Sequence, residues 1–381
     1  MPDTVSFGIG CFHFGVKGQL PLTFRGSEYI AEIRRVLESL PSIDGIQIHA
    51  DKDFEDSIVQ VTTELPRLRA VTGCFPRGAF VDLSFQIYLP QRVQEELVAD
   101  IPWVTPPTER YRVTILYGFE MPVAFVESIG EIIGKIPSQD PSDGVVVVRE
   151  FMTNAVSDDT SEHVFFDWMG PTPFHADCFL AASTTDEDPA DTWTFKLHRD
   201  PSSGFDRLMF ECSPTRSGHL DTARFHLFSK LLPEISVFYY ILCRDQNRTL
   251  EWAEIAVALD DLISLQQLRG PKGHLKRVLS SSRDATELLL RVARFEGDMV
   301  LARSAIRGKR DHLYTGRSDD FMRSYVDRAI RELGSYPTEQ VSRSLDLIHS
   351  ARVKSVDNMM LLGAALLSGA AGALLIHWLS R

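Results

Sequence analysis

The sequence predicts an α+β fold: a mixed β-sheet domain with helices, followed by an all-helical region and a single C-terminal transmembrane helix. Three observations lead to this fold class. Apolar residues alternate with polar ones through much of the first 215 positions, helical periodicity replaces that alternation after Gly218, and 22 uncharged residues occupy 358–379. We therefore expect an α+β domain at 1–215, a helical domain at 216–336, a juxtamembrane stalk helix at 337–357 and the transmembrane helix at 358–379.

Ten stretches of the first part have the period and composition of strands. The clearest is 79–89, where Val81, Leu83 and Phe85 begin a series of apolar residues at every second position. The predicted strands are residues 5–16, 43–49, 57–63, 79–89, 110–119, 144–151, 162–167, 176–182, 192–198 and 207–212.

Three helices are expected among these strands. Residues 27–40 begin with Ser27 as an N-cap and place Ile30, Ile33 and Val36 on one face. The other two are residues 91–100 and 123–136. This order of elements favours mixed strand pairing over a steady β-α alternation.

The second part has helical periodicity, and its glycines and prolines fall where helices should end. The predicted helices are residues 220–243, 250–267, 284–307 and 319–333, followed by one that starts at Thr338. Between Pro337 and Gly363 there is neither proline nor glycine. The last cytoplasmic helix is therefore expected to run unbroken into the bilayer.

The segment 358–379 has the length and composition of a membrane span. Its 22 residues contain no Asp, Glu, Lys or Arg, and at about 1.5 Å per residue they cover the roughly 30 Å of a hydrocarbon core. Arg343, Arg352 and Lys354 precede the span and Arg381 alone follows it. This asymmetry predicts a single-pass protein whose N-terminal bulk lies in the cytoplasm.

Small residues repeat at every fourth position within this span. One row is Ala365, Gly369 and Ala373, and the other is Ala364, Ser368 and Gly372. Such rows let two helix backbones approach closely, and close packing drives helix association in lipid. We expect the partner to be a second copy of the chain, as a homo-oligomer, or another membrane protein.

The net charge of −12 is unevenly distributed. Residues 1–265 hold 21 basic and 40 acidic residues, whereas residues 266–335 hold 15 basic and 9 acidic ones. The basic segment adjoins the predicted anchor, where it could face an anionic lipid bilayer. Nucleic acid is not the expected partner, because the α+β part is acidic and the basic residues of the helical part are not interleaved with aromatic residues into a stripe.

The five cysteines are scattered, without a C-x-x-C pair, which argues against a disulfide framework or a structural zinc site. No positive charge precedes the apolar start of the chain, so no signal peptide is expected. The motifs of phosphate loops, dinucleotide sites, zinc proteases and serine hydrolases are missing from the sequence. No cofactor can therefore be named.

The sequence His-x-Asp occurs four times, more often than the composition leads one to expect. The pairs are His49/Asp51, His175/Asp177, His198/Asp200 and His219/Asp221. On a strand, residues two apart share a face, so each pair could present an imidazole with a carboxylate. This combination suits a divalent metal or a histidine that acts as a general base. The alternative is a surface hydrogen bond or a turn cap.

The segment 168–178 is the most promising single place for a site. Gly170, Pro171 and Pro173 predict a rigid turn that leads into a strand, and this turn would present His175 and Asp177 to a ligand or partner. A structural corner is the alternative interpretation. Nothing local would lower the pKa of Cys178, which argues against a nucleophilic role.

Three functions follow from these patterns. The first is a membrane-anchored, cytoplasm-facing sensor, effector or scaffold that self-associates. Action on the membrane itself is an extension of this hypothesis, based on the packing face of the span. The second is a membrane-tethered enzyme that uses the His-x-Asp pairs, with or without a metal. The third is ion transport, because the order of parts resembles the layout of CorA-type magnesium channels. That resemblance implies a second span and a Gly-Met-Asn loop, and this chain has neither.

Overall fold

The computed structural model describes residues 4–17, 25–56, 58, 61–62, 73–76, 81–130, 140–156, 160–161, 163–182, 194–201, 205–212, 220–267, 271–316, 320–347 and 350. The chain forms two compact units. Unit 1 comprises Met1–Arg244 and Arg307–Glu332, and unit 2 comprises Asp245–Ile306 and Leu333–Arg381. Two helices run through both units.

Unit 1 contains a mixed β-sheet, as the sequence predicted. Along the sheet the strands follow the order β10, β11, β9, β1, β7, β6, β5, β2, with β8 and β4 paired to the second half of β1 and β3 paired to β4. Only the β9–β11 pairing is parallel among the strands described. Their bounds are β1 Thr4–Lys17, β2 Ile43–Ala50, β3 Val61–Thr62, β4 Gly73–Pro76, β5 Val81–Tyr88, β6 Arg110–Tyr117, β7 Val123–Ile129, β8 Val164–Met169, β9 Ala176–Ala182, β10 Phe195–Asp200 and β11 Asp206–Cys212.

The helices of the sheet-forming part of the chain are α1 Gly26–Glu38, α2 Lys52–Asp56, α3 Gln91–Leu97 and α4 Pro141–Ala155. Helix α4 lies directly against the central strand β1. A Cβ atom at Gly8 would come within 2.5 Å of the Val145 side chain and 2.9 Å of the Pro141 carbonyl oxygen. Glycine at this position therefore permits the close packing of α4 on the sheet.

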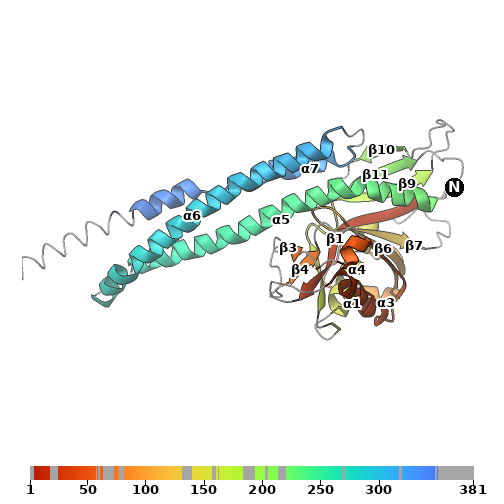
Figure 1. Ribbon diagram of the computed structural model, residues 1–381, viewed down its shortest axis with the longest axis horizontal. Coiled ribbons are helices and arrows are strands. Elements are labelled where there is room, and N and C mark those ends of the chain that lie inside the picture. The colour runs from red at the N-terminus through yellow and green to blue at the C-terminus, as the bar shows by residue number, and fades with distance from the viewer. Residues whose placement is uncertain are drawn as a thin grey trace, which may run out of the picture. The chain divides into compact units, whose positions relative to one another are not determined.

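Helix α5 comprises Leu220–Gln267, and its part within unit 1, up to Arg244, packs on the opposite face of the sheet (Figure 1). The Phe228 ring stacks on Phe125 of β7 with centroids 4.0 Å apart and contacts Phe7 of β1 edge to face at 5.0 Å. Nearby, the Arg224 guanidinium pairs with the buried Glu127 carboxylate at 2.9 Å. Apolar burial and a paired buried charge thus hold the first turns of α5 on the sheet.

Helices α6, Pro271–Tyr314, and α7, Arg323–Arg331, follow α5 in the chain. Within unit 1 they join α5 through Glu234, whose side chain is fully buried. Its Oε2 accepts hydrogen bonds from the Tyr314 hydroxyl at 3.0 Å and from the Met322 backbone N–H at 2.9 Å. This carboxylate fixes the end of α6 and the start of α7 against α5.

Unit 2 is a helical packing with its own apolar core. The core residues come from α5, α6 and a helical stretch at 338–347: Ile255, Leu262, Ala285, Leu288, Val292, Phe295, Val341 and Leu345. Trp252, Phe295 and Tyr336 form an aromatic cluster at one end, with centroids 5.1 to 5.5 Å apart. The predicted helical region is therefore present.

Two predicted elements were wrong in type. Residues 144–151, predicted as a strand, belong to α4, and residues 123–129, predicted as the start of a helix, form the strand β7. In addition, the predicted helices 220–243 and 250–267 are one continuous helix, α5. The predicted strand 57–63 is reduced to the two residues of β3 within the part described.

The predicted membrane span, 358–379, lies outside the residues that the structure describes, as do its small-residue rows. Among the residues that it does describe, no helix has both the length and the apolar character needed to cross a membrane. The division into domains at 215 and 336 stays a prediction.

Candidate functional site

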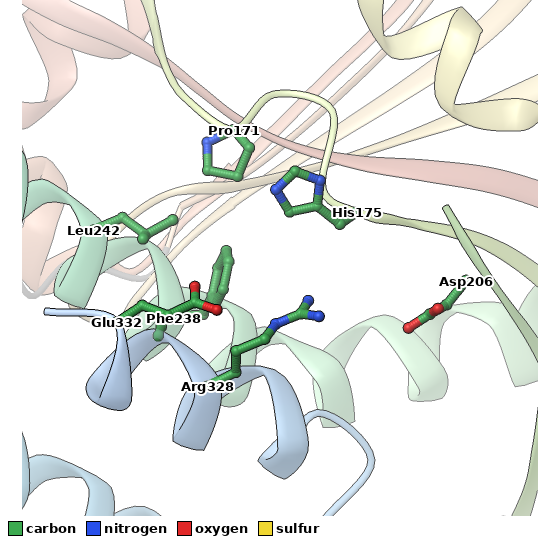
Figure 2. A pocket seen from close by; sticks show the side chains of 8 residues that line it. Pro171, His175, Asp206, Phe238, Leu242, Arg328 and Glu332 are labelled. Atoms are coloured by element: carbon green, nitrogen blue, oxygen red, sulfur yellow. The ribbon is translucent and has the colours of Figure 1, made fainter. Parts of the chain in front are cut away.

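A pocket of about 410 Å³ opens in unit 1 between the β8–β9 loop, α5 and α7. Pro171 and His175 come from the loop, Phe238 and Leu242 from α5, and Asp206 from the start of β11. Arg328, Ala329 and Glu332 come from the end of α7. Figure 2 shows His175 and Arg328 on opposite sides of the pocket, with Asp206 beyond them on one side and Glu332 beside Phe238 on the other.

The loop that carries His175 is anchored by the residue before it. The Phe174 backbone N–H donates to the Ile9 carbonyl at 2.7 Å, and its buried ring contacts Phe238 and Tyr325 with centroids 5.0 and 4.9 Å away. Because Phe174 is held in the core, the next side chain, His175, is directed outward into the pocket. The loop is thereby a fixed wall of the pocket.

Tyr325 of α7 links two of the charged pocket residues. Its hydroxyl donates a hydrogen bond to the Asp206 carboxylate. The guanidinium of Arg328 lies over its ring, 5.2 Å from the centroid. Burial, and then the bond to Asp206, raise the pKa of Tyr325, so the phenol stays protonated as the donor.

Burial is the main cause that lowers the pKa of His175, and the Arg328 charge lowers it further. Glu332 and Asp206 act in the opposite direction. At neutral pH the imidazole is therefore uncharged, with one N–H donor and one acceptor nitrogen. The lining then carries two carboxylates and one guanidinium, a net charge of −1.

Three of these groups have unused hydrogen-bonding capacity. The side chains of His175, Arg328 and Glu332 form no hydrogen bond or ion pair with any residue in the described part of the chain. Small-molecule sites are usually concave and apolar, with a few polar groups of this kind around them. These groups can bind an anion at Arg328 and a cation at Glu332 or Asp206.

The structure separates His175 from Asp177. Asp177 lies within β9, is buried, and its Oδ1 accepts the backbone N–H of Ser142 in α4 at 2.9 Å. His175 precedes β9 and is the central residue of a tight turn, in which the Ala176 N–H donates to the Phe174 carbonyl at 2.7 Å. The alternation of a regular strand therefore does not apply to this pair.

The other His-x-Asp pairs are far from this pocket or from one another. His49 lies on β2 and His198 on β10, the strands at opposite ends of the sheet. Asp51 and Asp200 are exposed beside them, Asp221 lies near Arg112 and Arg224, and His219 is outside the described residues. Over the residues described, no three His, Cys, Asp or Glu side chains are placed to hold a metal ion.

The sequence contained no local signal for most of the pocket. Asp206, Phe238, Arg328 and Glu332 belong to no motif, and they are brought together by the packing of α5 and α7 on the loop. Only the Gly-Pro-Thr-Pro turn at 170–173 pointed to this part of the molecule. Cys178 lies behind the loop, fully buried, and burial raises the pKa of its thiol.

Comparison of the chain with protein-family models, with curated proteins and with solved structures finds no match in any of the three.

Proposed function

We propose that this protein is a membrane-anchored, cytoplasm-facing sensor that self-associates, and that the pocket beside α7 is where it recognises a small ligand. The sequence of residues 358–379 supports the anchor, and its rows of small residues support association of copies. The pocket adds a recognition site, with unpaired charges on apolar walls.

One observation carries the sensor proposal: the position of α7 in the chain. Arg328 and Ala329 lie on its last turn and Glu332 at its end, so all three touch whatever fills the pocket. Six residues after Glu332 the helical stretch 338–347 begins, and it leads along the chain toward 358–379. A ligand that binds more tightly when α7 is in one position than in another would shift α7 toward that position. The chain that follows α7 would pass this shift on to the stretch 338–347.

Membrane attachment is tested by fractionation. The full-length chain should sediment with membranes, and the chain lacking residues 358–381 should be soluble and folded, with unit 1 retaining its secondary structure by circular dichroism. Equal sedimentation of both chains would contradict the anchor.

The relay is tested separately, without a ligand, by hydrogen–deuterium exchange on the full-length protein. Removing both α7 charges from the pocket, by Arg328→Gln with Glu332→Gln, should change amide exchange in residues 338–347. Arg331→Gln, an exposed change on the same helix outside the pocket, should not. Identical exchange in the double variant and the parent would mean that the pocket and the stalk are independent.

A further inference from the structure

We propose that the pocket beside α7 takes a small zwitterion of the amino-acid class, with an apolar side chain. This inference rests on the proposed function, in which the pocket is the recognition site. It adds the chemical class of the ligand, and the experiment that tests it measures ligand binding alone.

The charge of the lining excludes some ligand classes and favours one. Asp206 and Glu332 are negative, Arg328 is positive, and His175 is uncharged at neutral pH. A phosphate dianion at Arg328 would lie among two carboxylates and be repelled. A zwitterion adds no net charge and offers an opposite charge to Arg328 and to Glu332, while Asp206 already accepts the Tyr325 hydroxyl.

The spacing on α7 fits the two charges of an amino acid. Arg328 and Glu332 are four residues apart, so their side chains leave the helix on the same side, with Cβ atoms about 5 to 6 Å apart. They form no ion pair with each other, and the guanidinium lies over the Tyr325 ring instead, 5.2 Å from its centroid. Each can therefore receive one end of a zwitterion.

A carboxylate has two donors available in the middle of the pocket. Figure 2 shows the His175 imidazole and the Arg328 guanidinium on opposite sides of the same open space, and the Arg328 charge acts on His175. The guanidinium can donate two parallel hydrogen bonds to a carboxylate, and a neutral imidazole can donate one more. The ammonium group of the same molecule is then within reach of Glu332.

The apolar walls lie beside Glu332, where a side chain would project. Phe238 and Leu242 are one helical turn apart on α5, and Pro171 and Ala329 face the same space. A volume of about 410 Å³ lies at the small end of the range of ligand pockets, roughly 300 to 1,000 Å³. It suits a molecule of the size of leucine or phenylalanine.

The test is calorimetric titration of the full-length protein in detergent with matched probes. L-phenylalanine and L-leucine carry both charges, 3-phenylpropionate lacks the amine, and 2-phenylethylamine lacks the carboxylate. We expect at least one of the two amino acids to bind roughly tenfold or more tightly than either single-charge probe. Failure of both amino acids to bind, or equal binding of a single-charge probe, overturns the proposal.

Two variants locate the binding. Arg328→Gln should weaken the binding of the amino acid about tenfold and leave the affinity for 2-phenylethylamine unchanged. Glu332→Gln should leave the affinity for 3-phenylpropionate unchanged. Arg331→Gln is the matched control, which should bind as the parent does. Undiminished amino-acid binding in both pocket variants, with melting temperatures equal to the parent, also overturns the proposal. Neither result affects the fractionation and exchange experiments, which use no ligand.

Discussion

The Asp177 carboxylate accepts the backbone N–H of Ser142 at 2.9 Å, which joins strand β9 to the first turn of helix α4. The Ser142 hydroxyl returns the contact by donating to the Ala176 carbonyl at 3.2 Å. The first N–H groups of a helix have no partner inside it, and here a residue 35 positions away supplies one. Asp177 is thus a helix cap that belongs to the sheet.

Removal of this cap should destabilise unit 1. Asp177→Ala deletes a buried acceptor and leaves the Ser142 N–H without one, a cost of about 1 to 3 kcal/mol. We expect a clearly lower melting temperature, followed by the fluorescence of the tryptophans in detergent. Asp177→Asn keeps an acceptor oxygen, so its melting temperature should fall much less than that of Asp177→Ala. Equal melting of the alanine variant and the parent would show that the contact has no net effect on stability.

The same cap helps to explain why residues 144–151, which were predicted as a strand, form part of a helix. Four consecutive valines, Val145–Val148, favour β structure when considered by themselves. In the structure all four are buried, because α4 is enclosed by the sheet and its neighbours. Pro141 in the first turn and the distant Asp177 start the helix, and tertiary packing outweighs local preference.

Strand β7 was missed for a related reason. It lies between β1 and β6, and Val123–Val126 are buried on both faces of the sheet. A strand covered on both faces shows a continuous apolar run, without the alternation that identifies a half-exposed one. By contrast, β5 alternates buried and more exposed residues along its length, and its sequence predicted it correctly.

The pocket was predictable only in part. The rigid turn at 170–173 indicated where to look. The lining residues outside this loop, however, lie at least 31 residues from His175 in the sequence, at Asp206, on α5 and on α7. The periodicity and residue spacing of a single sequence do not predict which helix ends pack against a given loop. The His-x-Asp pattern does not place Asp177 in this pocket, because the Asp177 carboxylate accepts the Ser142 N–H of α4.

The buried Glu234 gives a second stability prediction. Tyr314→Phe removes the hydrogen bond that the phenol donates to this carboxylate at 3.0 Å, without opening a large cavity. We expect a loss of about 1 to 2 kcal/mol, or roughly 2 to 4 °C in melting temperature. Tyr88→Phe is the control, because that hydroxyl is at the surface and its bond to Glu109 is long, 3.4 Å. An equal shift in both variants would contradict a special role for Glu234.

Glu32 predicts a dependence of stability on pH. Hydrogen bonds from Arg35, and a further one from Ser161, lower the pKa of this carboxyl to about 2, from an ordinary value of 4.5. Because the folded pKa is the lower one, the stabilisation is complete above about pH 4.5 and is lost as the pH falls toward 2.

The measurement compares melting temperatures of the parent and Glu32→Gln between pH 6 and pH 3. The parent should be the more stable protein at pH 6, and the difference should shrink as the pH falls. Glu38→Gln, an exposed change on the same helix, should show no such trend. A difference that is constant with pH would mean that the charge of Glu32 contributes nothing.

The last prediction concerns Gly369 and the proposed self-association. It is the middle residue of the row Ala365, Gly369 and Ala373, where a missing side chain allows the closest approach of two helices. Gly369→Ile keeps the span apolar, so insertion should persist, but the added bulk would separate the backbones and remove packing contacts. We expect crosslinked species in membranes to shift from oligomer toward monomer.

Leu367→Ile is the matched control, since Leu367 lies off both small-residue rows and the change adds no bulk. Its crosslinking should equal that of the parent. Packing between membrane helices yields only modest free energies, with polar pairs worth about 0.6 to 2 kcal/mol, so a weak oligomer responds to the loss of a few contacts. An unchanged pattern in Gly369→Ile would assign the predicted span to anchoring alone and leave any assembly to the helices that precede it.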